Sequence, residues 1–325
     1  MTEDILNKAA EKGIIQPEQI APLVDFIQQQ QEIPDSEHGE EQLKFIRNFG
    51  DIFITLGIVF VAVSAAALSL PQLMWLIPAG LFILTSEWLV RVRRLALPGI
   101  ALLISTLYFI SRALGLDELD NATVSLLILS GCSLLFYVRY RMPFSLLPVA
   151  AGLVAAVISL IGVDMVNHQY LFSLLGLCVF SAAMAFDARD RERALRYSDC
   201  GFWLHLLASP LIVHGMMTTV LFTDSSVLTA GLTKELMLIL FFILFFLVAL
   251  FVDRRAMLVS SLSYAIYAII QVTEDSVLAV DNLPLFIFMS FGIFIVFFGT
   301  YWYKARRLIF GKAENLEIAQ YVPHF

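Results

Sequence analysis

Charged residues are scarce in this chain, and their scarcity excludes a water-soluble fold. Asp, Glu, Lys and Arg make up 15% of the 325 residues, whereas hydrophobic residues make up 59%. The mean hydropathy is +0.81. Because a soluble domain carries about 25% charged residues, the composition predicts an integral membrane protein.

Cysteine is also scarce, which argues against a disulfide framework. Cys132, Cys178 and Cys200 are widely spaced, lie in or beside apolar runs and form no CxxC pair. Such cysteines behave as small buried apolar side chains. The sequence also lacks an HExxH motif and any Cys/His cluster, so we expect no metal and no other cofactor.

The apolar residues are gathered into stretches of membrane-spanning length. Ten such stretches occur, at about 52–70, 73–90, 95–111, 122–138, 144–163, 170–186, 201–222, 236–252, 256–272 and 284–303. We therefore predict an all-α, polytopic membrane helical bundle of about ten helices arranged as sequential hairpins. Its expected parts are an acidic helical hairpin (1–31), a linker with an interfacial helix (32–49), a transmembrane domain (50–303) and a polar tail (304–325). The intervening loops are too short to hold a folded soluble domain.

The basic residues predict how the chain is oriented. With an even number of spans, both termini lie on one side of the membrane. That side carries 19 of the 21 Lys and Arg residues, and only Arg112 and Lys234 fall on the other. Since short basic loops remain in the cytoplasm, we expect cytoplasmic termini. Charged residues also precede the first apolar run, so we expect no secretory signal peptide.

Two motifs recur along the chain. Leu114–Asp117 (LGLD) is echoed by Ile161–Asp164 (IGVD), and Arg93–Arg94 is echoed by Arg254–Arg255. These echoes indicate repeated hairpins in parallel orientation. Chance similarity between aliphatic spans is the alternative interpretation.

The N-terminal segment differs from the rest in charge. Residues 1–49 contain ten acidic and four basic side chains, which supply almost all of the net charge of −7. Gly13 suits the end of one helix and Pro17 the start of another, which predicts a short helical hairpin. Its acidity argues against nucleic-acid binding. A protein partner in the cytoplasm or membrane is the expected ligand of residues 1–31.

The same segment carries a resemblance. ILNKAAEKGIIQPEQIAPLVDFI, a polar linker and a first span entered through FIRNFGDIFITLGIVFVAVS cover residues 5 to about 70. This arrangement resembles a family of bacterial multi-pass membrane proteins grouped as a domain of unknown function. The resemblance implies a protein of the bacterial inner membrane. It carries no activity that could be transferred to residues of this chain.

Ionisable residues at membrane depth are functional candidates, because burying them in hydrocarbon is costly. Glu87 lies one helical turn before Arg91, so a local ion pair accounts for it. His205 and His214 share the seventh span. Nine residues amount to half a turn beyond whole turns, so we predict that the two imidazoles face opposite sides and bind no common metal. A kink at Pro210 would relax this prediction.

Polar side chains also recur at helical spacing on two spans. The longer stripe, in the ninth span, consists of Ser260, Tyr264, Tyr267 and Gln271. The shorter stripe, in the third, consists of Ser105, Tyr108 and Arg112. Such stripes face the bundle interior, where they bind neighbouring helices or line a solute pathway.

Three classes of function remain open. We favour a non-catalytic scaffold, sensor or assembly factor, because the acidic hairpin is set apart on a polar linker. A transporter or flippase of a small or amphipathic solute is the alternative, although no charged pair lies near mid-span to couple an ion. An intramembrane enzyme is the third, with Glu87, Asp187, Asp199 and His205 as its acid-base candidates. Their spacing alone shows no convergent geometry.

Overall fold

The structure is a computed structural model of the chain. It describes residues 6, 10, 13, 14, 16–24, 48–162, 169–193, 195–222, 234–255, 257, 258, 283–311 and 321–323. The chain divides into two compact units, Met1–Glu41 and Gln42–Phe325. In the first unit, Gly13 has a left-handed φ of +69° and Pro17 opens the helical turn η1 (Pro17–Gln19). Both agree with the predicted turn, whereas most of the two predicted helices lies outside the described residues.

The second unit is predominantly helical in its described part, which contains no strand. Its helices are α3 (Phe49–Ala66), α4 (Leu76–Ser86), α5 (Ala96–Leu114), α6 (Ala122–Tyr140), α7 (Leu146–Ile161), α8 (Gln169–Asp187), α9 (Arg196–Phe222), α10 (Lys234–Val252) and α12 (Leu283–Phe310). Short turns extend two of them: η2 (Gln72–Trp75) and the π-helix η3 (Glu87–Val92) flank α4, and η4 (Pro143–Ser145) precedes α7. The predicted all-α fold class is thus confirmed.

Within the part of the chain that the structure describes, seven helices are long and apolar enough to cross a membrane. They are Phe49–Ala66, Gln72–Val92, Ala96–Leu114, Ala122–Tyr140, Pro143–Ile161, Tyr170–Asp187 and Arg196–Thr218, and Leu240–Val252 is a shorter apolar helix. They coincide with the first eight predicted spans, and the tenth falls within α12. All of the ninth except Met257 and Leu258, including Ser260, Tyr264, Tyr267 and Gln271, lies outside the described residues. The count of ten therefore stays a prediction.

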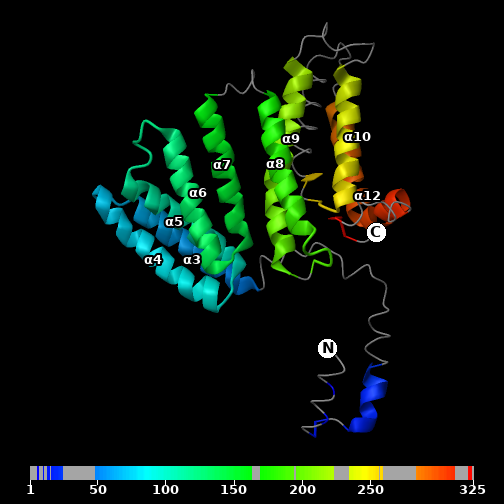
Figure 1. The fold of residues 1–325 in the computed structure, drawn as a ribbon, viewed down its shortest axis with the longest axis horizontal. Helices are drawn as coiled ribbons and strands as arrows, with labels where there is room; N and C mark the ends of the chain where they lie inside the picture. The colour runs from blue at the N-terminus through cyan, green and yellow to red at the C-terminus, as the bar shows by residue number, and fades with distance from the viewer. Residues whose placement is uncertain are drawn as a thin grey trace. The chain divides into compact units, whose positions relative to one another are not determined.

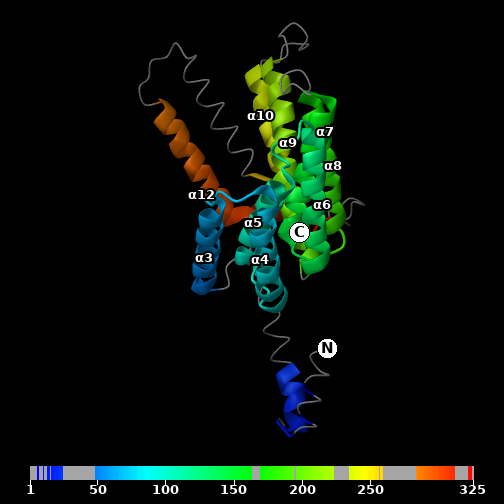
Figure 2. The same cartoon turned by 90° about the vertical axis from the view of Figure 1, so that its left-hand side faces the viewer.

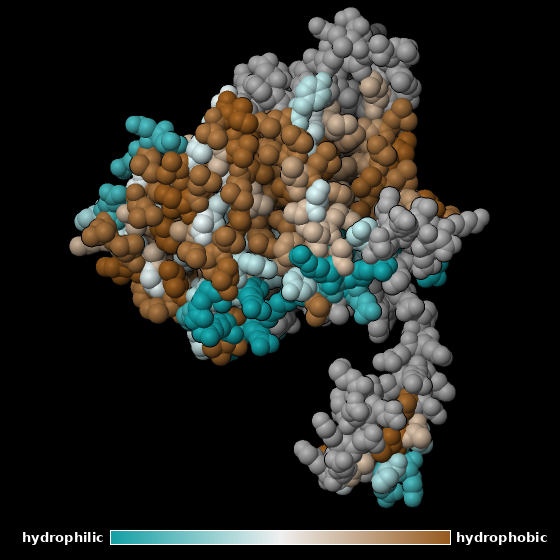
Figure 3. All heavy atoms as spheres, in the orientation of Figure 1, coloured by the Kyte–Doolittle hydropathy of each residue, from teal (hydrophilic) through white to brown (hydrophobic). Residues whose placement is uncertain are grey.

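The closest helix pairs are consecutive and antiparallel: α4 with α5, α6 with α7, and α8 with α9, whereas α3 packs against α5 and α7 against α9 (Figures 1 and 2). Helices α3, α4 and α5 enclose one apolar cluster around Phe82, Leu102 and Phe109. Helices α7, α8 and α9 enclose a second cluster around Ala183 and Ala208. A third lies among α9, α10 and α12. The side chains that these clusters leave outside are also apolar: hydrophobic residues cover most of the face seen in Figure 3. An exposed apolar surface of this extent suits lipid rather than water.

The hairpins close at one end of the bundle in a recurrent way. Among the described residues at that end, four other than glycine have a left-handed φ: Arg94 (57°), Arg141 (50°), Arg193 (53°) and Asp253 (59°). This conformation costs roughly 1 kcal/mol in a residue with a Cβ. We call the end formed by residues 87–95, 139–143, 187–198 and 250–255 the basic end. Much of the hydrophilic surface of the second unit lies along its lower edge in Figure 3, and a further group lies at its upper left.

The turns after α5 and α7 use glycine instead. Gly115 and Gly162, the glycines of the recurring LGLD and IGVD motifs, have φ values of 60° and 67°. In both cases the glycine ends the preceding helix with a left-handed residue. The motif repeat therefore has a common local geometry. The arginine repeat matches less closely, because the left-handed residues are Arg94 and Asp253 rather than Arg94 and Arg255.

Candidate functional site

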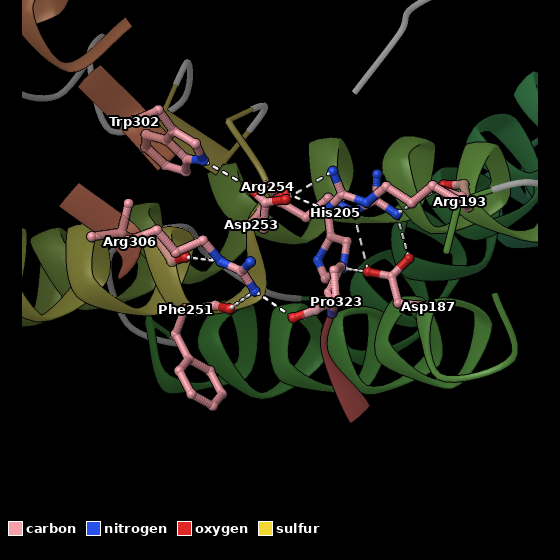
Figure 4. Close-up of polar contacts among 11 residues, drawn as sticks. Asp187, Arg193, His205, Phe251, Asp253, Arg254, Trp302, Arg306 and Pro323 are labelled. Carbon is pink, nitrogen blue, oxygen red and sulfur yellow. Dashed lines mark hydrogen bonds and ion pairs between the residues drawn. The ribbon is translucent and has the colours of Figure 1, made fainter. Parts of the chain in front are cut away.

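Charged side chains are buried where α8, α9, α10 and α12 meet at the basic end. Five of them are almost inaccessible to solvent: Asp187, His205, Asp253, Arg254 and Arg306. Burying a charge is costly unless it is paired and hydrogen-bonded. Figure 4 shows that these side chains point toward one another from different helices. We call Asp187, Arg193, His205, Asp253, Arg254, Trp302 and Arg306 the buried ionic network.

Asp187 is the centre of the first half of the network. It is the last residue of α8, and its carboxylate accepts from two sides. Nε2 of His205 lies 2.9 Å from Oδ2. The Nε nitrogen of Arg254 donates to the same oxygen over 3.1 Å, and Nη2 of Arg254 donates to Oδ1. An ionised carboxylate only accepts, so His205 carries a proton on Nε2.

Arg254 extends this contact to the start of α9. Its Nη2 nitrogen donates to the main-chain oxygen of Ser198 over 3.0 Å and to the Ser198 hydroxyl over 3.1 Å. Gly201 lies one turn further along α9, and a Cβ there would collide with the Asp187 carboxylate. The glycine therefore allows α9 to approach the ion pair closely. One arginine thus binds the end of α8 to the first turn of α9.

Asp253 is the centre of the second half. Its Oδ2 atom is 3.1 Å from Nη1 of Arg193, and its Oδ1 accepts from the indole nitrogen of Trp302 over 2.6 Å. Arg193 also donates to the main-chain oxygen of Asp253. Both residues have a left-handed φ. The α8–α9 turn is thereby joined to the end of α10 and to α12.

Arg306 binds the carboxyl end of α10. Its Nε donates to the oxygen of Leu250 over 3.2 Å, and its Nη2 donates to Phe251 over 3.3 Å and to Pro323 over 2.7 Å. The last carbonyls of a helix have no partner within it, and the guanidinium supplies one. Burial lowers the pKa of Arg306 below its usual value. Asp253 opposes this shift, whereas the neighbouring Arg193 adds to it.

The C-terminal part of the chain differs from the expected polar tail. Helix α12 changes direction at Tyr301, where the backbone leaves the helical region (φ −105°, ψ 17°), close to the predicted end of the span at 303. Beyond this kink Arg306 is buried, and Val322 is completely buried. Residues 304–325 therefore contribute core residues to the basic end rather than a tail alone.

Asp190 orders the turn between α8 and α9. Its Oδ2 accepts from the main-chain nitrogens of Leu195 (2.9 Å) and Ser198 (3.2 Å). This is how an acidic side chain caps the start of a helix. The turn that carries Arg193 is thus stabilised by Asp190 within the turn as well as by Asp253.

Glu87 forms the predicted pair with Arg91, at 3.3 Å. Its better partner is Arg139 of α6, whose Nε and Nη2 donate to the two carboxylate oxygens over 2.8 and 2.9 Å. The Tyr140 hydroxyl adds a contact of 3.2 Å. Glu87 therefore joins η3 to α6 on a partly exposed surface at the basic end.

The shorter polar stripe does not act as one unit. Ser105 is buried and donates to the oxygen of Ala101 in its own helix. Tyr108 is 44% exposed on the apolar surface. Arg112 pairs with Asp117 and stacks over Trp75. The longer stripe, Ser260, Tyr264, Tyr267 and Gln271, lies outside the part of the chain that the structure describes.

The two histidines both contact α8. His205 lies 5.1 Å from the ring of Phe180, and His214 lies 5.2 Å from the ring of Phe172. On a regular helix the two imidazoles would face opposite sides, so their common contact with α8 departs from the prediction. Pro210 lies inside α9 between the two histidines. They do not share a ligand position. Among the described residues, no group of three metal-ligating side chains occurs.

Sequence reasoning named Asp187 and His205 together but missed the arginines and Trp302 that hold them. Arg193, Arg254 and Arg306 appear in the sequence as loop charges of the kind that sets orientation. The signal that distinguishes them is weak: Asp253 is an acidic residue placed directly before two arginines. Asp199, the remaining acid-base candidate, is exposed in the first turn of α9.

Comparison of the chain with protein-family models, with curated proteins and with solved structures finds no match in any of the three. The resemblance carried by residues 5 to about 70 therefore remains a prediction.

Proposed function

We propose that the chain is a non-catalytic scaffold, sensor or assembly factor of the bacterial inner membrane. In this proposal its termini and its basic end face the cytoplasm, and its first unit, Met1–Glu41, binds a protein partner. The bias of 19 of 21 basic residues to one side supports this orientation. The division of the chain into two compact units supports a separate binding part.

The observation that carries the proposal is the use of the buried charges. Both carboxylate oxygens of Asp187 accept hydrogen bonds, from Arg254 and His205. Both carboxylate oxygens of Asp253 do so as well, from Arg193 and Trp302. A catalytic acid or base must reach a substrate, and His205 and Asp187 are almost fully buried. The geometry therefore favours a network that fixes helix ends over one that performs acid-base chemistry.

The described helices give less support to the transporter alternative. A solute pathway along α5 would place Ser105, Tyr108 and Arg112 on a common interior surface. Instead the Ser105 hydroxyl is bound within its own helix, and Tyr108 is 44% exposed. What remains in favour of a pathway is the stripe from Ser260 to Gln271, as a prediction from spacing.

Photocrosslinking in the producing cell tests the partner. A photoreactive residue replaces Glu18, which is exposed in the first unit, and in a matched control it replaces Glu118, which is exposed between α5 and α6. We expect one protein adduct at position 18 and none at position 118. Deletion of residues 1–31 should abolish the cellular phenotype that depends on the partner. Reporter fusions after Phe325 and at Asp120 test the orientation, and only the first should be active in the cytoplasm.

A second comparison separates the scaffold from the enzyme. Asp187→Asn and His205→Gln are compared with the deletion of residues 1–31 in cells that depend on the chain. The scaffold proposal is contradicted if the deletion preserves the phenotype while either substitution abolishes it in a protein that still folds and inserts. The scaffold proposal is supported if the deletion abolishes the phenotype while both substituted proteins preserve it.

A further inference from the structure

The end of α12 is a short helix that lies across the bundle rather than along it. Helix α12 changes direction at Tyr301, and residues 302–310 follow this kink. In Figure 1 the red end of α12 lies across the lower end of α10. Trp302 and Arg306 hold it there, because the first binds Asp253 and the second binds main-chain oxygens at the carboxyl end of α10. We call residues 302–310 the terminal helix.

One face of the terminal helix is committed to the rest of the protein. Trp302 and Arg306 are almost inaccessible to solvent. Phe310, one turn further along, packs against Phe251 with the ring centroids 5.2 Å apart. Residues four apart share one face of a helix. The other faces of the terminal helix are therefore the ones that meet its surroundings.

The exposed side of the terminal helix combines large apolar residues with basic ones. Leu308 is 87% exposed, the highest value for a large hydrophobic residue in the described part of the chain, and Ile309 is 48% exposed. Lys304 and Arg307 are exposed as well. At about 100° per residue, the two basic residues lie on one flank and the two apolar residues on the adjoining flank. This arrangement is typical of helices that lie in the membrane interface.

Aromatic residues indicate the depth at which the terminal helix lies. Trp88, at the basic end, is 55% exposed, and the guanidinium of Arg93 is 5.0 Å from its ring. Tyr301 is 42% exposed, and Nζ of Lys304 is 5.4 Å from its ring. Exposed Trp and Tyr side chains gather at the level of the lipid headgroups, where Lys and Arg extend toward water. Because Arg306 holds the terminal helix at the same end, this helix also lies at headgroup depth.

We propose that the terminal helix binds anionic phospholipids of one membrane leaflet. Leu308 and Ile309 occupy the boundary between headgroups and acyl chains, where they continue the apolar surface of the spans. Lys304 and Arg307 lie against the phosphates, whose negative charge attracts basic residues near the membrane surface. Since the terminal helix also carries Arg306, this contact joins the buried ionic network to the lipid. The proposal depends on the membrane location of the apolar helices and not on the proposed function.

Photocrosslinking to lipid in a purified preparation tests the contact. A photoreactive residue replaces Leu308 in the full chain, which is placed in nanodiscs of equal parts phosphatidylglycerol and phosphatidylcholine. In the matched reference it replaces Ile293, which is 62% exposed on α12 before the kink. Mass spectrometry should identify lipid adducts at both positions. The ratio of phosphatidylglycerol to phosphatidylcholine adducts should be about fivefold higher at position 308, the effect of one basic residue near an anionic lipid surface.

Three outcomes of this experiment would overturn the proposal. Absence of lipid adducts at position 308 would show that the terminal helix does not contact the membrane. Equal adduct ratios at positions 308 and 293 would show that it has no preference for anionic lipid. An adduct with a second copy of the chain at position 308 would show that the exposed face is a contact between copies instead.

Substitutions link the lipid preference to the basic flank of the terminal helix. Lys304→Gln combined with Arg307→Gln should lower the adduct ratio at position 308 to the value found at position 293. Arg93→Gln combined with Arg189→Gln is the matched control, because it removes two exposed positive charges from other elements of the basic end. This control should leave the ratio unchanged. All four side chains are exposed, so both proteins should fold, which thermal unfolding in detergent checks. An unchanged ratio in the first protein, or equal reductions in both, would overturn the proposal.

Discussion

Asp253 accepts a hydrogen bond from the indole nitrogen of Trp302 over 2.6 Å, although the two residues are 49 positions apart. The same carboxylate pairs with Arg193. One side chain at the end of α10 therefore connects the α8–α9 turn with α12. Its backbone is left-handed, so a strained residue lies at the junction of three elements.

Replacing Asp253 by Asn should destabilise the protein by about 3 kcal/mol, because Arg193 would remain buried without its counter-charge. The substitution keeps the shape of the side chain and still allows an oxygen to face Trp302. Thermal or denaturant unfolding in detergent measures the loss.

Asp120→Asn is the matched control, since Asp120 is exposed in the loop between α5 and α6. It should change the unfolding free energy by less than about 0.5 kcal/mol. Equal effects of the two substitutions would show that the pair of Arg193 and Asp253 contributes nothing specific.

A double-mutant cycle on Asp187 and Arg254 should reveal strong coupling. Asp187→Leu leaves a buried guanidinium, and Arg254→Met leaves a buried carboxylate, so each should cost several kcal/mol. The double substitution removes both charges, and its cost should fall short of the sum of the single costs by about 1 to 3 kcal/mol. Unfolding in detergent measures all three proteins under the same conditions.

The exposed pair of Arg112 and Asp117 supplies the reference cycle. Its side chains are 40% and 41% exposed, and exposed pairs contribute about 0 to 1 kcal/mol. Arg112→Gln and Asp117→Asn should therefore be nearly additive. Additivity in the Asp187 and Arg254 cycle as well would contradict a coupled network.

The network shows which contacts a sequence can predict in a chain of this kind. The pair of Glu87 and Arg91 follows from helical spacing, because residues four apart share a face. The contact of Arg139 with the same carboxylate spans 52 positions, and that of Arg254 with Asp187 spans 67. Such contacts depend on how hairpins pack, which local periodicity does not encode. The spans themselves are predictable because each is a local run of apolar residues.

The basic residues illustrate the same limit. Arg193, Arg254 and Arg306 look in sequence like any other loop or tail arginine, and counting them predicts orientation. In the structure they are buried and bind the ends of helices. Their second role depends on the left-handed turns at Arg193 and Asp253, where no glycine or proline marks an unusual backbone. The turns at Gly115 and Gly162, by contrast, are marked in the sequence by a residue that adopts this conformation readily.

Gly201→Ala should destabilise the chain by about 1 to 3 kcal/mol, the usual cost of overpacking. A Cβ at this position would collide with the Asp187 carboxylate and lie 3.3 Å from Nη2 of Arg254. The ion pair would have to move away from α9. Gly131→Ala is the matched control, because Gly131 lies within α6 with no atom within 4 Å of an added Cβ. There the substitution should stabilise the helix by up to about 1 kcal/mol. The two proteins should thus shift in opposite directions in the same unfolding assay, and a loss of stability in both would point to a general effect of alanine.

Gly152→Ala should weaken the packing of α6 against α7, and a second substitution should partly restore it. An added Cβ would collide with the Ser130 hydroxyl oxygen and lie 3.3 Å from the oxygen of Leu126. The Ser130 hydroxyl also donates to Val149 of α7 over 3.1 Å, so it cannot move aside without losing that bond. Ser130→Ala removes the obstacle at the cost of one hydrogen bond, about 1 kcal/mol. The double substitution should therefore be more stable than Gly152→Ala alone, although the oxygen of Leu126 keeps it below the original protein. If Ser130→Ala fails to restore any stability, the main chain of α6 rather than the hydroxyl limits how closely the two helices approach.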